Sequence, residues 1–431
     1  MLNDASSEPQ HSTQNQSWWR RLSAGLITGA ADDDPSGIAT YSQVGAKFGY
    51  ATLWSLFLAL PLMIGIQIVS GRIGRVTGKD LGQNLRQHFA RPWVYSILAL
   101  LVIANVINIG ADVAAMGAAL QLLIGGPAVV YGIGFALLSL GFQVFIPFSR
   151  YSPVLKVLTV SLFAYVATVF VEKIPWGQAL HGTLIPAFQW NRDYAVAIVA
   201  VLGTTISPYL FCWQAAQEVE EIRSSNEREP LSDKPSQAPD ALRRINIDTS
   251  VGMVFSNVVA FFIVLTGAAV LHAHGKTDIQ SSAQAAEALR PVAGRFAFYL
   301  FAAGIIGTGL LAIPVLAGAT AFAVSGGSGH RYGLEYKPKN ARFFYGVLIV
   351  SMLLGAALNL TSIDPIKALY WSAVVNGVCA VPMMVMMMLL AQRNSAMGPQ
   401  VVRGLVAWLG WAATVVMGIA AIVMFLTLGN G

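Results

Sequence analysis

Long runs of apolar residues recur along the whole of this 431-residue chain. Each is close to the roughly 20 residues that an α-helix needs to cross the hydrocarbon of a bilayer. Only 11% of the residues are charged, whereas a soluble domain carries about a quarter. Backbone in hydrocarbon must bond to itself, and β-barrel strands would alternate and be half as long. The pattern therefore predicts an all-α polytopic membrane protein with eleven transmembrane helices, at about 21–46, 51–71, 93–122, 126–147, 154–171, 194–217, 249–272, 296–326, 343–361, 368–391 and 405–428.

The distribution of basic residues predicts the orientation in the membrane. If the N-terminus is cytoplasmic, 20 of the 27 Lys and Arg lie on cytoplasmic segments. This split follows the positive-inside rule, and an odd number of spans then places the C-terminus outside. Topology accounts for the net charge of +6, and no basic patch interleaved with aromatic residues indicates a nucleic-acid partner. We expect an integral protein of the cell (inner or plasma) membrane, with the lipid bilayer around it.

Segments outside the spans complete the predicted organisation. Residues 1–17 are polar and predict a disordered cytoplasmic N-terminus. Residues 79–90 predict a short amphipathic helix on the inner face, and 224–242 predicts a cytoplasmic linker rich in Ser, Pro and charge. The rest, 18–428, reads as one transmembrane domain.

The first span is interrupted by three consecutive acidic residues. Asp32, Asp33 and Asp34 lie mid-span and are followed by Pro35, Ser36 and Gly37. Acidic groups at membrane depth are costly and are usually functional, while proline removes a backbone donor. A Pro-Gly pair alone is often only a kink, but a triple Asp has few structural explanations. We therefore predict a helix that unwinds at mid-depth.

The sixth span has a second interruption, five spans after the first. It contains small and polar residues before a proline, namely Gly203, Thr204, Thr205, Ser207 and Pro208. Corresponding breaks in two five-helix halves predict an inverted repeat with a binding site at the repeat interface. The first repeat is expected at about 18–172, the second at about 193–391, and an extra helix at 405–428. Unwound carbonyls together with Asp side chains suit a cation.

These motifs resemble those of a known transporter family. The segment Asp34-Pro35-Ser36-Gly37 resembles the Asp-Pro-Gly-Asn motif in the first helix of Nramp divalent-metal transporters. Ser207-Pro208-Tyr209 resembles their Met-Pro-His motif in helix six, and residues 71–81 resemble the stretch between their second and third helices. The resemblance covers spans one to ten. It implies the LeuT-type fold, with an inverted 5+5 repeat and discontinuous helices one and six.

The resemblance also implies a set of metal ligands and shows where this chain departs from it. Asp34 is kept, the family Asn is replaced by Gly37, and the family Met is replaced by Ser207. The ligating carbonyls would be those of Ala31 and Thr204. The two helix-six histidines of the family are replaced by Tyr209 and Gln214, and this pattern resembles the Nramp-related magnesium transporters.

Ligand chemistry favours the same ion. A thioether suits softer transition metals, whereas oxygen ligands suit Mg²⁺ and Ca²⁺. Magnesium is usually held by one or two carboxylates and keeps several waters. We expect Gly37 and Ser207 to enlarge the site and leave room for a partly hydrated ion, with Asp34 as the anchor and Asp32 or Asp33 lining the approach.

Further polar residues inside the spans are candidates for the ion pathway. Asn105, Asn108 and Asp112 have helical spacing on the third span, although interhelical hydrogen bonding is an alternative role. Gln214 and Glu218 lie four residues apart on the sixth span, where Glu218 could equally cap the cytoplasmic end. Tyr209 is expected to fill the space left by the family histidine.

The sequence therefore predicts a secondary transporter that takes up Mg²⁺, and also Mn²⁺, by alternating access. We expect no tight coupling to protons, because Tyr209 and Gln214 do not titrate near neutral pH. A proton-coupled Mn²⁺ or Fe²⁺ transporter is the nearer alternative, and a sodium-coupled carrier of an organic solute is the more distant one. No nucleotide-binding loop or His/Cys constellation indicates an enzyme or a cofactor, and no obligate protein partner is evident.

Overall fold

The computed structural model describes residues 28–29, 31–146, 160–225, 227–334, 336–361 and 363–428, and the described part of the chain is helical without strands. Its longer helices are α2 (Pro35–Phe48), α3 (Leu53–Thr77), α5 (Arg91–Ile124), α6 (Ala128–Phe145), α8 (Phe163–Val171), α10 (Arg192–Thr205), α11 (Pro208–Arg223), α12 (Ala238–Thr266), α15 (Ala297–Ser328), α16 (Arg342–Leu358), α17 (Pro365–Ala391) and α19 (Gly404–Leu428). Shorter helices connect them: α4 (Leu81–His88), α9 (Trp176–Leu184), α13 (Ser282–Ala286), α14 (Arg290–Ala293) and α18 (Asn394–Met397).

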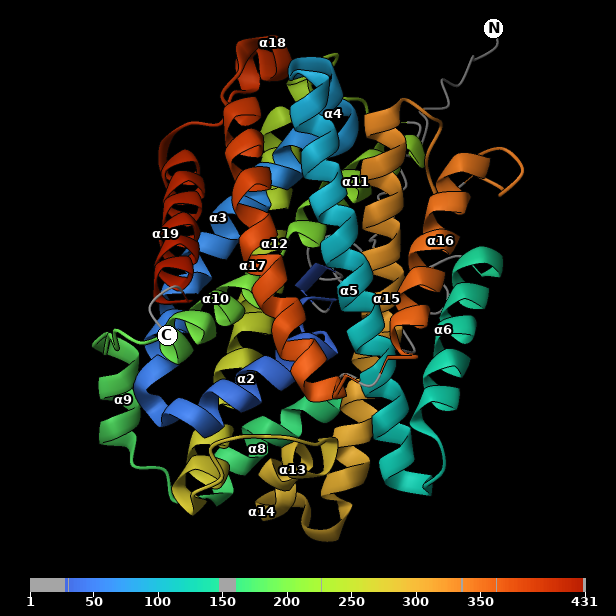
Figure 1. Ribbon diagram of the computed structural model, residues 1–431. Coiled ribbons are helices and arrows are strands. Elements are labelled where there is room, and N and C mark those ends of the chain that lie inside the picture. The colour runs from blue at the N-terminus through green and yellow to red at the C-terminus, as the bar shows by residue number, and fades with distance from the viewer. Residues whose placement is uncertain are drawn as a thin grey trace, which may run out of the picture.

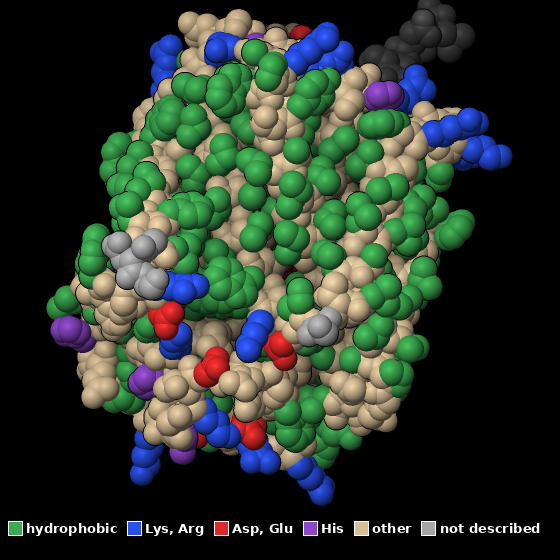
Figure 2. Space-filling view, viewed as in Figure 1, with side chains coloured by type: hydrophobic (Ala, Val, Ile, Leu, Met, Phe, Trp, Pro, Cys, Tyr) green, Lys and Arg blue, Asp and Glu red, His purple; other side chains and the backbone are tan. Residues whose placement is uncertain are grey.

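The helices form one bundle in which distant segments of the chain pack together. α5 packs on α15, α10 on α17, and α3 on both α11 and α19. Figure 1 shows α2, α10, α11 and α12 inside this bundle, with α6 and α19 at its edges. Figure 2 shows apolar side chains over a wide band, with charged side chains gathered towards its two ends. This is the surface of a protein surrounded by lipid.

Each of the eleven expected spans overlaps a helix among the described residues. Eight helical segments there are long and apolar enough to cross a membrane, and two shorter apolar helices, Val160–Val171 and Arg342–Leu358, accompany them. One of the eight, Pro35–Thr77, contains both α2 and α3. The membrane fold is therefore confirmed, whereas the count of eleven crossings stays a prediction. The expected disordered segment 1–17 lies outside the described residues.

Two of the predicted segments outside the spans can be compared with the structure. The amphipathic helix expected at 79–90 is confirmed as α4. The linker expected at 224–242 is wrong at its end, because α12 begins at Ala238 and not near 249. Ala238, Ala241, Ile245 and Asp248 are buried along one face. This extra length is amphipathic, so a search for uncharged runs does not find it.

Candidate functional site

The first predicted break lies where α2 begins, and it is organised by Asp34. Asp34 has extended backbone angles, and its side chain caps α2. Asp34 Oδ1 accepts hydrogen bonds from the Gly37 backbone N–H at 2.8 Å and from the Ser36 hydroxyl at 2.6 Å. Pro35 occupies the first helical turn, where its missing N–H costs nothing. The break thus places a carboxylate at the positive end of a helix.

The second break separates α10 from α11. The backbone leaves helical geometry at Ile206 and Ser207, and Pro208 starts the new helix. The Ser207 hydroxyl lies 2.7 Å from the Gly203 carbonyl oxygen and 3.1 Å from that of Thr204. Its side chain is therefore engaged with the last turn of α10, and one of its acceptors is the predicted ligand carbonyl of Thr204.

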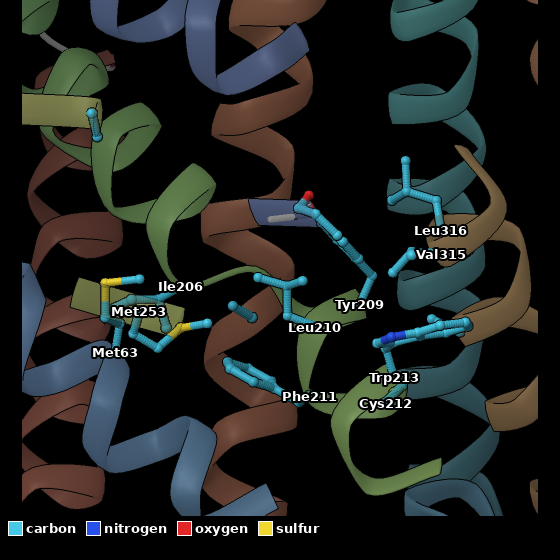
Figure 3. Packing of buried hydrophobic residues seen from close by; sticks show 14 of the residues in the cluster. Met63, Ile206, Tyr209, Leu210, Phe211, Cys212, Trp213, Met253, Val315 and Leu316 are labelled. Carbon is cyan, nitrogen blue, oxygen red and sulfur yellow. Dashed lines mark hydrogen bonds between the residues drawn. The ribbon is translucent and has the colours of Figure 1, made fainter. Parts of the chain in front are cut away.

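Tyr209 connects the two breaks. Its hydroxyl donates to the Ala31 carbonyl oxygen at 3.1 Å, so one of the predicted ligand carbonyls contacts helix α11. In Figure 3, Tyr209 and Trp213 extend from α11 to the side of Val315 and Leu316, and Met63 lies on the other side. The two breaks are thus in direct contact inside the apolar core of the bundle.

The polar face predicted on the third span divides into three different environments. Asn108 donates from Nδ2 to Asp34 Oδ2 at 2.9 Å. Asn105 instead donates to the Thr320 hydroxyl on α15 at 2.8 Å. Both carboxylate oxygens of Asp112 are buried and have no hydrogen-bond partner among the described residues. Only Asn108 of this predicted set contacts Asp34.

The other two acidic residues of the first break face α12. The Ser256 hydroxyl lies 2.5 Å from Asp32 Oδ2 and 3.0 Å from Asp33 Oδ1. Asp32, Asp33 and Asp34 are 1%, 2% and 1% exposed. Three buried carboxylates side by side are strongly unfavourable as anions unless a cation or bound protons neutralise them. This arrangement favours a cation at the break. Ser256 was missed because a single serine in a span is ordinary.

The space beside Gly37 differs from the expectation. A Cβ atom on Gly37 would lie 3.2 Å from Thr204 Oγ1 and 3.3 Å from Tyr41 Cε2. The loss of the family Asn therefore does not leave an open volume here, because the Thr204 and Tyr41 side chains occupy it. The enlarged site expected from Gly37 and Ser207 therefore stays a prediction, and any extra volume does not lie at the Cβ position of Gly37.

Gln214 and Glu218 lie on α11 and make contacts between helices. Gln214 Oε1 accepts from the Thr28 hydroxyl at 2.8 Å, which ties the first span to α11. Glu218 is fully buried and forms an ion pair with Arg244 of α12 at 2.5 Å. Within the described part of the chain, neither side chain bonds to Asp34. Arg244 was missed because it precedes the expected start of the seventh span.

A metal ion at this place would have to be held by side chains and backbone carbonyl groups together. Among the described residues, no group of three or more His, Cys, Asp or Glu side chains is placed to hold a metal ion. The available donors are the Asp34 carboxylate, the Asn108 side chain and the carbonyls at the two breaks. These are all oxygen donors, which suit hard cations.

Comparison with known proteins identifies related transporters. The divalent metal cation transporter MntH of Verminephrobacter eiseniae is 27% identical over 295 residues, covering 66% of this chain and 63% of that protein. The MntH protein of Yersinia enterocolitica is 29% identical over 289 residues, covering 64% and 65%. The matched part of the chain thus spans just under two thirds of the length of these relatives.

Solved structures show the same fold. The Eremococcus coleocola manganese transporter, in complex with an aromatic bis-isothiourea compound, superposes with a TM-score of 0.72 at 18% identity, covering 97% of this chain and 88% of that one. Mhp1, a nucleobase-cation-symport-1 family transporter, gives a TM-score of 0.61 at 15% identity, covering 94% and 87%. The predicted fold class is confirmed by these likenesses.

The family itself is shown by a match along nearly the whole chain. The model described as natural resistance-associated macrophage protein-like, or Nramp, matches residues 25–427. That range contains both breaks, the polar face of α5 and the extra helix α19. The chain therefore belongs to the Nramp family.

Proposed function

We propose that this protein is a secondary transporter of divalent metal cations, with the ion held where the two broken helices meet. The observation that carries the proposal is the position of Asp34, which is buried at the start of α2 and bonded to Asn108 of α5. The names of the relatives, divalent metal cation transporters, support the same substrate class. In the proposed site Asp34 is the anchor, and the carbonyls of Ala31 and Thr204 with the region of Gly37 and Ser207 complete it.

We further propose Mg²⁺ as the preferred ion, with Mn²⁺ also transported. The support is the donor set, since Ser207 replaces the thioether that the family resemblance implies and the remaining donors are oxygen atoms. Mn²⁺ as the main substrate is the nearer alternative, because a manganese transporter shares this fold. A carrier of an acidic organic solute is disfavoured by Asp32, Asp33 and Asp34, whose negative charges would repel it.

The coupling and the orientation are also proposals. Transport is proposed to proceed without tight coupling to protons, on the basis of Tyr209 and Gln214 at the positions of the family histidines. The N-terminus is proposed to be cytoplasmic and the C-terminus outside, on the basis of the distribution of Lys and Arg.

The proposed function is tested by uptake of Mg²⁺ and Mn²⁺ into proteoliposomes containing wild-type protein or Asp34→Asn. Asn caps a helix about as well as Asp, so the variant should fold but lose at least about 99% of uptake, because it lacks the anchoring charge. Asp364→Asn is the matched control, since Asp364 caps α17 in the same way.

Uptake by Asp364→Asn should stay near that of the wild type. A pH-sensitive dye inside the wild-type proteoliposomes should show no acidification that follows metal entry. Near-normal uptake by Asp34→Asn would reassign the anchor to Asp32 or Asp33. Acidification in step with uptake would favour the proton-coupled alternative.

A further inference from the structure

A cavity of about 220 Å³ lies at the ends of the broken helices that are farthest from the candidate site. It is formed by the end of α2, the start of α10, the start of α17 and the segment at 278–279. Charged and polar side chains line it, among them Gln43, Lys47, Asp193, Asp278 and Lys367. In Figure 1 this region lies at the α9 and α13 end of the bundle, which the proposed topology places outside.

One face of α2 runs from this cavity to the break. Lys47, Val44, Thr40 and Gly37 are three or four residues apart, so they lie one above another on a helix. Lys47 and Val44 line the cavity, and Gly37 belongs to the break. Val44 and Thr40 are 1% and 0% exposed. The route along this face is therefore closed between the cavity and the site.

A matching face of α10 runs beside it. Asp193, Val196, Ala200 and Thr204 have the same helical spacing, and Asp193 and Val196 line the cavity. The faces meet at the inner end, where Thr204 Oγ1 would lie 3.2 Å from a Cβ on Gly37. Val196 and Ala200 are 6% and 0% exposed. Both also pack in one cluster with Ala373 and Val374 of α17, so movement of α2 away from α10 and α17 would connect the cavity with the site.

Three contacts hold the outer end of α2, one to α10 and two to the segment at 278–279. Lys47 Nζ forms an ion pair with Asp193 Oδ2 at 2.7 Å, which joins α2 directly to α10. Gln43 Nε2 donates to Asp278 Oδ1 at 3.3 Å, and Gln43 Oε1 accepts from the Ile279 N–H at 2.8 Å. The two Gln43 contacts join α2 to the segment after α12.

We propose that Lys47, Asp193 and Gln43 form a gate that holds the outer end of α2 against α10 and the segment at 278–279, and that opens when a cation enters from this cavity. The identity of the transported cation rests on the proposed function, whereas the gate itself does not. Lys47 and Asp193 are 38% and 61% exposed. An ion pair in water is weak, which suits a contact that breaks and forms again in each cycle.

The gate is tested by the rate at which a cysteine beneath it reacts with a membrane-impermeant methanethiosulfonate. The reporter is Thr40→Cys, which is buried on the α2 face between the cavity and the break. It is made in full-length protein in proteoliposomes, with the two buried native cysteines, Cys212 and Cys379, changed to Ala. Lys47→Ala in this background should raise the rate about two- to five-fold, as expected for the loss of an exposed ion pair. Asp193→Asn should act in the same direction.

The control is Lys367→Ala, because Lys367 lines the same cavity and makes no ion pair within the described ranges. Its labelling rate should match that of the reporter protein without a gate substitution. The double variant Lys47→Asp with Asp193→Lys, which reverses the ion pair, should again be labelled slowly. Unchanged labelling in both Lys47→Ala and Asp193→Asn, or an equal rise in Lys367→Ala, would overturn the gate. Since labelling is measured without metal, a failure of the gate is distinguishable from a failure of metal transport.

Discussion

The two helix breaks contact each other but bring different chemistry to the site. The first carries three buried carboxylates, of which Asp34 bonds to α5 and Asp32 and Asp33 approach Ser256 of α12. The second carries no charge, and the hydroxyls of Thr205 and Ser207 bond to backbone carbonyls of α10.

This difference in chemistry suggests that the first break attracts the ion and the second break determines which ion is preferred. If the first break supplies the attraction for a cation and the second supplies uncharged oxygen donors, changes at Asp34 should remove binding of every divalent ion. Changes at Ser207 should instead alter which ion is preferred. The predictions below compare the two breaks on this basis.

The largest change in ion preference is expected for Ser207→Met. A thioether adds a soft donor that Mn²⁺ or Cd²⁺ can use and Mg²⁺ cannot. In competition uptake, the ratio of Mn²⁺ to Mg²⁺ should rise about ten-fold, equivalent to about 1.4 kcal/mol. Ser207→Leu is the matched control, because it has similar size and no sulfur. An equal shift with Leu would show that side-chain volume, and not softness, sets the preference.

Restoring the family Asn with Gly37→Asn would be harder to interpret than Ser207→Met. An Asn side chain at this position would meet Thr204 and Tyr41, so the change would combine a new ligand with a steric conflict. The single Ser207→Met variant therefore isolates the contribution of ligand softness.

A smaller effect, on stability alone, is expected for Asp80→Asn. Asp80 caps α4 as Asp34 caps α2, accepting from the Gln83 N–H at 2.8 Å. It lies outside the spans, and its burial raises the pKa of the carboxyl to about 7 from its ordinary value of 3.8. A raised pKa means that the folded state favours the protonated form, so the stability due to this group is fully present below about pH 4. It is lost as the pH rises through about 7.

Asp80→Asn should therefore raise the unfolding temperature at pH 8 and change it little at pH 4, with uptake per folded protein unchanged. Thermal unfolding in detergent at the two pH values is the measurement. A loss of uptake as large as that of Asp34→Asn would mean that neutralising a buried capping carboxylate away from the site also stops transport, so the Asp34 result would not identify the ion's anchor.

Much of the fold could be predicted because membrane helices follow hydropathy closely. The two breaks were also visible, since Asp34-Pro35 and Ser207-Pro208 interrupt otherwise apolar runs. The start of α12 was not, because Ala238, Ala241 and Ile245 alternate with charged residues and bury only one face.

The contacts within the site could not be predicted in the same way. Nothing in the sequence indicates that Ser256 lies between Asp32 and Asp33, because the pairing depends on how α12 packs against the break. The same holds for Gly37, whose missing side chain suggested an open site until Thr204 and Tyr41 were placed beside it. Spacing predicts which residues share a face, but packing decides what that face meets.

The most direct test of the account is calorimetric titration of purified wild type, Asp34→Asn and Ser207→Ala with MgCl₂. The account predicts binding by the wild type, binding within about five-fold of it by Ser207→Ala because one neutral hydroxyl is lost, and affinity at least about a hundred-fold weaker in Asp34→Asn. Equal affinity of wild type and Asp34→Asn for Mg²⁺ would contradict the claim that the first break holds the ion through Asp34.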